Sequence, residues 1–69
     1  MQDRIYKHIE LTGSSHKGIE DAVAKALERA GKTLHYLHGF EVIDIRGIVD
    51  GKAKLLWQVS IRAAFTLDE

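Results

Sequence analysis

The chain has 69 residues, with 10 basic and 10 acidic side chains, a formal net charge of zero and no cysteine. The missing cysteine excludes disulfides and thiolate zinc sites, and the balanced charge argues against nucleic acid and against a polybasic membrane contact. We therefore expect one domain over residues 1–69 that spans no membrane, with the cytoplasm as its default location.

The first half of the chain predicts a strand followed by a helix. Arg4 to Thr12 alternates between the two faces of a strand, and Gly13-Ser14-Ser15 ends it. A serine hydroxyl of this segment can cap the next helix by accepting a hydrogen bond from a backbone N–H in its first turn. From Ile19 to Leu34 the apolar residues recur at the i, i+3, i+4, i+7 spacing of one helical face, and the helix continues past Gly31. Three residues of this face are alanine, so we expect it to approach a sheet closely.

The second half predicts a long β-hairpin. Phe40 to Gly51 is rich in β-branched residues, and its closing Asp50-Gly51 pair predicts a type I′ turn. Leu55 to Phe65 alternates strictly, with Trp57 in the apolar set and Gln58 in the polar set. Together the elements predict an α+β fold in which a three-stranded antiparallel sheet (β-α-β-β) wraps around one helix.

Chain length and strand length both predict an oligomer. A core this small is marginal by itself, and no disulfide can reinforce it. The hairpin strands are about twelve residues long, about twice the usual length, so one helix cannot cover the sheet. The uncovered face must meet water, a ligand or other copies of the chain.

Metal binding and catalysis have little support in the residues. His35 and His38 are three apart and would lie close together on a helix, but two histidines without a third donor make a weak site. Ser14-Ser15-His16 is an adjacent set without an oriented base, and a helix cap explains its serines better. We expect neither a metal site nor an enzyme.

Four segments in order resemble the dodecins, small flavin-binding proteins that assemble as hollow dodecamers. The segments are YKHIELTGSS (Tyr6 to Ser15), EDAVAKALERAGKTL (Glu20 to Leu34), FEV followed by IRG (Phe40 to Val42 and Ile45 to Gly47), and WQVSIRAAF (Trp57 to Phe65). The resemblance covers nearly the whole chain. It implies a non-catalytic flavin-binding and storage protein, a homododecamer that holds flavin (FMN, riboflavin or FAD) between its subunits.

The resemblance also implies which residues bind the flavin. Gln58 would hydrogen-bond the polar edge of the isoalloxazine ring, and Arg46 would help hold a phosphate-bearing tail. Asp44 falls near the same pocket. From the residues alone, Gln58 could equally be an exposed polar residue of a strand, and Arg46 could form a surface or interface ion pair with Asp44 or Glu41.

The main departure from the dodecin pattern is Gly39. Dodecins usually place a tryptophan directly before the F-E-V motif, where its indole stacks on the flavin, and losing that ring should weaken binding. A positive φ at the entry to the strand could also explain a glycine here. Thr66 is a second departure, because bacterial dodecins often have a basic residue there. Trp57 shares the apolar face and should point at the helix, so it cannot replace the indole.

Three residues near Gly39 could form the rim of the pocket: Tyr36, His38 and Phe40. The alternative to flavin is a shell of the same architecture that binds another small ligand or a metal ion, or that is purely structural.

Overall fold

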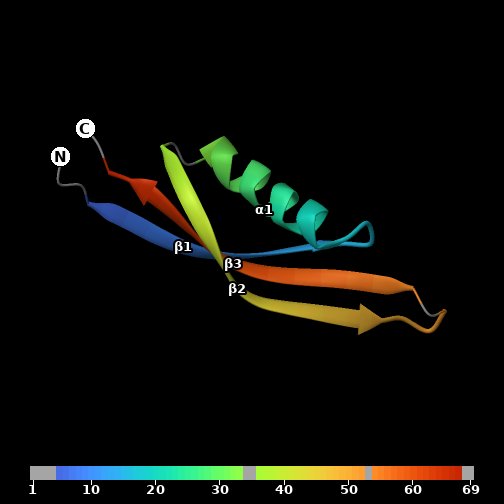
Figure 1. Ribbon diagram of the computed structural model, residues 1–69. Coiled ribbons are helices and arrows are strands. Elements are labelled where there is room, and N and C mark those ends of the chain that lie inside the picture. The colour runs from blue at the N-terminus through green and yellow to red at the C-terminus, as the bar shows by residue number, and fades with distance from the viewer. Residues whose placement is uncertain (1–4, 34–35, 53, 68–69) are drawn as a thin grey trace.

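Three antiparallel strands and one helix make up the computed structural model, which describes residues 5–33, 36–52 and 54–67 (Figure 1). The elements are β1 (Tyr6–Ser15), α1 (Ile19–Thr33), β2 (Leu37–Val49) and β3 (Leu55–Thr66). The sheet order is β1-β3-β2, and both neighbouring pairs are antiparallel. The predicted β-α-β-β order and fold class are confirmed. The predicted ends at Arg4 and Leu34 lie outside the described residues.

The helix packs on one face of the sheet through small side chains. Among the described residues, the core consists of alternate residues of β3 and one stripe of α1: Ala22, Val23, Ala26, Ala30, Val59, Ile61, Ala63 and Phe65. A Cβ added at Gly13 of β1 would collide with the carbonyl oxygen of Ala22 and lie 3.1 Å from the Cβ of Ala26. The predicted close approach of helix and sheet is therefore confirmed.

The helix is too short to cover the sheet. Its 15 residues span about 22 Å, whereas the 13 residues of β2 span about 43 Å. In Figure 1 the β2–β3 hairpin continues past the first turn of α1. The helix packs on β1 and β3, and large apolar side chains of β2 stay exposed: Leu37, Phe40, Val42, Ile43, Ile45, Ile48 and Val49.

The helix entry differs from the expected serine cap. Strand β1 runs on to Ser15, three residues beyond its predicted end, and α1 begins only at Ile19. The Ser15 hydroxyl therefore accepts a hydrogen bond from the N–H of Lys17 (2.9 Å), which precedes the helix, and not from a backbone N–H of the first turn. It also donates to a carboxylate oxygen of Asp21 (2.6 Å), which lowers the pKa of that carboxyl. Ser15 still holds the start of α1 in place, because it bonds to the Asp21 side chain in the first turn of the helix.

The predicted type I′ turn is wrong. Strand β2 ends at Val49 and β3 begins at Leu55, which leaves a longer connection than two residues. Among the described residues, Gly18 is the glycine with positive φ, so Gly51 lacks the geometry of that turn. One carboxylate oxygen of Asp50 accepts hydrogen bonds from the N–H groups of Lys52 and Lys54 (2.9 and 3.0 Å), which stabilises the longer loop and lowers the pKa of the carboxyl.

Candidate functional site

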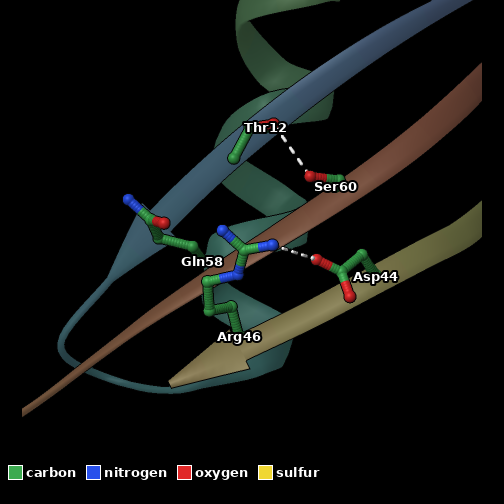
Figure 2. A pocket seen from close by; sticks show the side chains of 5 residues that line it. All are labelled: Thr12, Asp44, Arg46, Gln58 and Ser60. Carbon is green, nitrogen blue, oxygen red and sulfur yellow. Dashed lines mark hydrogen bonds and ion pairs between the residues drawn. The ribbon is translucent and has the colours of Figure 1, made fainter. Parts of the chain in front are cut away.

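The face of the sheet that α1 does not cover has a polar hollow on it. We call this face the open face. The hollow has a volume of about 150 Å³ and is lined by residues of all three strands: Thr12, Asp44, Arg46, Gln58 and Ser60. Figure 2 shows these side chains together on the side of the sheet away from the helix. Three of the residues that we predicted for flavin, Gln58, Arg46 and Asp44, meet here.

Strand pairing explains why the polar side chains converge. In β3 the odd-numbered residues from Val59 to Phe65 are buried beneath the helix, so the even-numbered ones occupy the open face. Register then brings Arg46 opposite Gln58 and Asp44 opposite Ser60. A bulge between Val42 and Asp44 makes this possible, since one extra residue moves the even-numbered side chains of β2 to the open face.

The hydrogen bonds in the hollow leave one amide available. Arg46 Nη2 lies 3.2 Å from a carboxylate oxygen of Asp44, and the hydroxyls of Thr12 and Ser60 are 2.9 Å apart (Figure 2). The half-buried Gln58 side chain shares no hydrogen bond with any described residue. Its amide can donate and accept at once, so the hollow can recognise a ligand edge that carries both a carbonyl and an N–H.

An ion-pair cluster crosses the open face beside this hollow. Arg62 lies 3.3 Å from a carboxylate oxygen of Glu41 and 3.5 Å from one of Glu10, so it links all three strands. The pairs are largely exposed to solvent in the single chain, and such pairs contribute little to folding.

A second hollow lies at the far end of the open face. It has a volume of about 380 Å³ and is lined by Tyr6, Tyr36, Leu37, His38 and Thr66. The rings of Tyr6 and His38 have centroids 5.0 Å apart and are tilted by 53°. Two predicted rim residues, Tyr36 and His38, therefore do line a hollow. The third, Phe40, does not, because it pairs with Ala63 and so faces the helix side of the sheet.

Gly39 has no backbone reason to be glycine. It lies in β2 opposite Ala64, and it is not among the described residues with positive φ. The positive φ at this junction belongs to Tyr36, at 65°. A Cβ built on Gly39 meets no atom within 4 Å. The explanation of the glycine by a positive φ is therefore wrong, and the position has room for a side chain.

Gly39 and Gln58 lie far apart in one chain. Gly39 pairs with Ala64, which is six residues along β3 from Gln58, or about 20 Å at the rise of an extended strand. Trp57 cannot join them, since it lies against Gly47 on the helix side of the sheet, as predicted. The predicted flavin residues thus form two groups.

Sequence reasoning missed four lining residues, which are Thr12 and Ser60 in the polar hollow and Tyr6 and Leu37 in the second one. Ser60 shares the alternation of Gln58 and could have been found from that pattern. Thr12 and Tyr6 come from β1, and nothing in the sequence fixes the register of β1 against β3. Long-range register had to come from the structure.

The described residues contain neither a candidate metal site nor a membrane-spanning helix. No group of three or more histidine, aspartate or glutamate side chains in the described part of the chain could hold a metal ion, and His35 lies outside that part. Within residues 5–33, 36–52 and 54–67, no helix is both long and apolar enough to cross a bilayer.

Comparisons with known proteins identify the family of the chain and agree with its fold. The sequence profile of the dodecin family matches residues 5–68. A Thermus thermophilus dodecin is 42% identical over 66 residues, which are 96% of this chain and 96% of the relative. The crystal structure of a point variant of T. thermophilus dodecin superimposes with a TM-score of 0.89 at 42% identity, over 97% of this chain and 98% of that one. Dodecin from Streptomyces coelicolor gives a TM-score of 0.90 at 36% identity, over 100% and 99% of the two chains. The chain therefore belongs to the dodecin family, whose members are non-catalytic proteins that bind small ligands.

Proposed function

We propose that this dodecin binds flavin without catalysis, in sites between the subunits of a homododecamer, and so stores it. FMN, riboflavin and FAD share the ring system and are all candidate ligands. The observation that carries the proposal is the convergence of Gln58, Arg46 and Asp44 on the open face, in the same hollow.

The residues of the hollow fit one part of a flavin. The isoalloxazine ring has a polar edge of carbonyl and N–H groups, and the Gln58 amide offers the complementary donor and acceptor. Arg46 supplies a cation that suits the phosphate of FMN or FAD, although Asp44 already neutralises part of its charge. None of the five described residues that line the hollow is aromatic, so a stacking surface must come from elsewhere.

The size of the hollow supports a site shared between subunits. Ligand pockets usually enclose about 300–1,000 Å³, whereas this hollow has about 150 Å³. The distance of about 20 Å between Gly39 and Gln58 also supports a site shared between subunits, because one flavin ring cannot touch both positions of a single chain. A second subunit would bring its own residue 39 to the hollow.

Exposed apolar surface supports the assembly. Half of the core described above is alanine, and seven large apolar side chains of β2 are each 38–66% exposed. Large exposed apolar side chains concentrated on one strand are typical of a surface that contacts a partner. Contacts between subunits would bury it and supply the stability that this small core lacks.

Equilibrium titration tests the proposal. Riboflavin and FMN fluorescence is measured as protein is added, for the wild type and for Gln58→Ala, Arg46→Ala and the control Glu28→Ala on the exposed side of α1. Gln58→Ala should weaken both ligands at least fivefold, which is about 1 kcal/mol for the lost hydrogen bonds. Arg46→Ala should weaken FMN more than riboflavin, and Glu28→Ala should change neither.

Light scattering on the same samples measures the assembly. We expect a dodecamer for the wild type and for all three variants. A stable monomer at micromolar concentration would refute the proposal, and equal affinities for Gln58→Ala and the wild type would show that the polar hollow does not hold the flavin. A dodecamer that ignores flavin would favour the alternative of another guest or a purely structural shell.

A further inference from the structure

We infer that Tyr6 and His38 form an aromatic platform on which the flavin ring system stacks, in place of the indole that Gly39 lacks. This inference rests on the proposed function, because it concerns how the same ligand is held. We call the two side chains the ring pair.

The ring pair is built by the two outer strands of the sheet. Tyr6 pairs with Thr66, so its side chain lies on the open face of β1. His38 comes from β2, and both rings reach over the middle strand, where Thr66 lines the hollow beneath them. Their centroid distance of 5.0 Å and their tilt of 53° fall within the range of favourable aromatic pairs.

A backbone irregularity turns His38 towards Tyr6. The register of β2 shifts between Leu37 and Gly39, which makes His38 the extra residue of a bulge. Bulges re-aim side chains, and they occur more often beside functional sites than elsewhere. Tyr36, directly before the strand, has a φ of 65°, a conformation that is uncommon for a bulky residue. Two irregularities within three residues thus shape this hollow.

The space beside the ring pair is large enough for a ring system. At about 380 Å³ the hollow has the volume of an ordinary ligand pocket, unlike the polar one. Gly39 lies opposite Ala64, one step along the open face from Thr66, and a Cβ there meets nothing within 4 Å. The space normally taken by an indole is therefore open, and aromatic rings already lie next to it.

Three variants separate ring stacking from bulk. Tyr6→Leu and His38→Leu remove a ring but keep an apolar side chain, whereas Tyr6→Phe keeps the ring. Riboflavin is the probe, because it has the ring system without a phosphate. We expect each leucine variant to weaken riboflavin about three- to tenfold and Tyr6→Phe to stay within about twofold of the wild type. Gln58→Ala is titrated in parallel as the test of the polar hollow.

Fluorine NMR tests the platform in the unmutated sequence. The chain has only two tyrosines, Tyr6 and Tyr36, and both line this hollow. Protein labelled with 3-fluorotyrosine therefore reports on the hollow alone. Riboflavin should shift or broaden both resonances, with a concentration dependence that matches the fluorescence titration.

The outcomes distinguish the platform from the proposed function. If Gln58→Ala weakens riboflavin while the leucine variants bind normally and the fluorine signals stay fixed, the platform is wrong and the flavin site stands. If the leucine variants weaken riboflavin and Gln58→Ala does not, the platform stands and the polar hollow loses its role. Absence of flavin binding by the wild type overturns both. Should a leucine variant fail to assemble, the fluorine spectra of the wild type decide.

Discussion

Replacing Gly39 by tryptophan should tighten flavin binding at least tenfold, which is about 1.4 kcal/mol. Stacking of an aromatic pair contributes about 0.5–1.5 kcal/mol beyond buried area. Burying a further 40 Å² or so of apolar surface on the indole adds about 1 kcal/mol at 25 cal/mol per Å². The backbone and the new Cβ add no strain within the subunit, since φ at Gly39 is not positive and an added Cβ meets no atom within 4 Å.

Fluorescence titration with riboflavin measures the gain, and Gly39→Leu is the matched control. Leucine adds apolar bulk at the same position without a ring, so it should recover only the area contribution and bind less tightly than the tryptophan variant. Light scattering confirms that each variant assembles as the wild type does. An assembled Gly39→Trp protein with unchanged affinity would show that position 39 does not contact the flavin, and the reasoning would fail.

Three further predictions concern the fold. Gly13→Ala should prevent stable folding or lower the thermal midpoint sharply, since the new methyl group collides with the carbonyl oxygen of Ala22 in α1; a midpoint within 2 °C or so of the wild type by circular dichroism would contradict the close approach. Ser15→Ala should cost about 1 kcal/mol in urea unfolding, because it removes the buried hydroxyl that donates to Asp21; an unchanged midpoint would show that this link does not fix the helix. The pKa of Asp50 is below its ordinary value of 3.8, so its stabilising effect is complete above that pH and is lost as the pH falls through the lower folded-state value. Asp50→Asn, which keeps an acceptor oxygen but cannot ionise, should lose less stability than the wild type between pH 4 and 2, and parallel pH profiles would refute the role of the carboxylate.

The elements and their order could be predicted because each has a strong local pattern. The helical stripe and the alternation of β3 identified the core, and they placed Trp57 and Gln58 on opposite faces of the sheet. Residue types typical of turns and caps were less reliable for predicting how the helix and strands begin and end. Asp50-Gly51 has the composition of a two-residue turn, yet the Asp50 carboxylate stabilises a longer loop by accepting two backbone hydrogen bonds.

The candidate site was only half predictable, because it depends on two bulges in β2. Beyond a bulge, the residues that would have faced one side of the sheet face the other side. No sequence pattern predicts where such a bulge occurs. The bulge before Asp44 gathers the polar residues with Gln58, and the one at His38 brings that ring to Tyr6. Alternation alone could not have predicted either contact.

The same two bulges would allow one small sheet to serve both proposed functions, which are ligand binding and contact with other subunits. A regular β2 would present one continuous set of side chains to the open face, and these could serve either contact with other subunits or ligand binding along the whole strand. Each bulge restarts the alternation, so the strand divides into a ring-bearing end, a central segment with Glu41 in the Arg62 ion pairs, and a polar end with Arg46. Ligand-binding side chains can then face the open side at both ends of β2, while the intervening apolar residues stay available for neighbouring subunits. A long strand with two bulges thus provides both ligand-binding and contact surfaces, for which a chain of 69 residues has no separate loops.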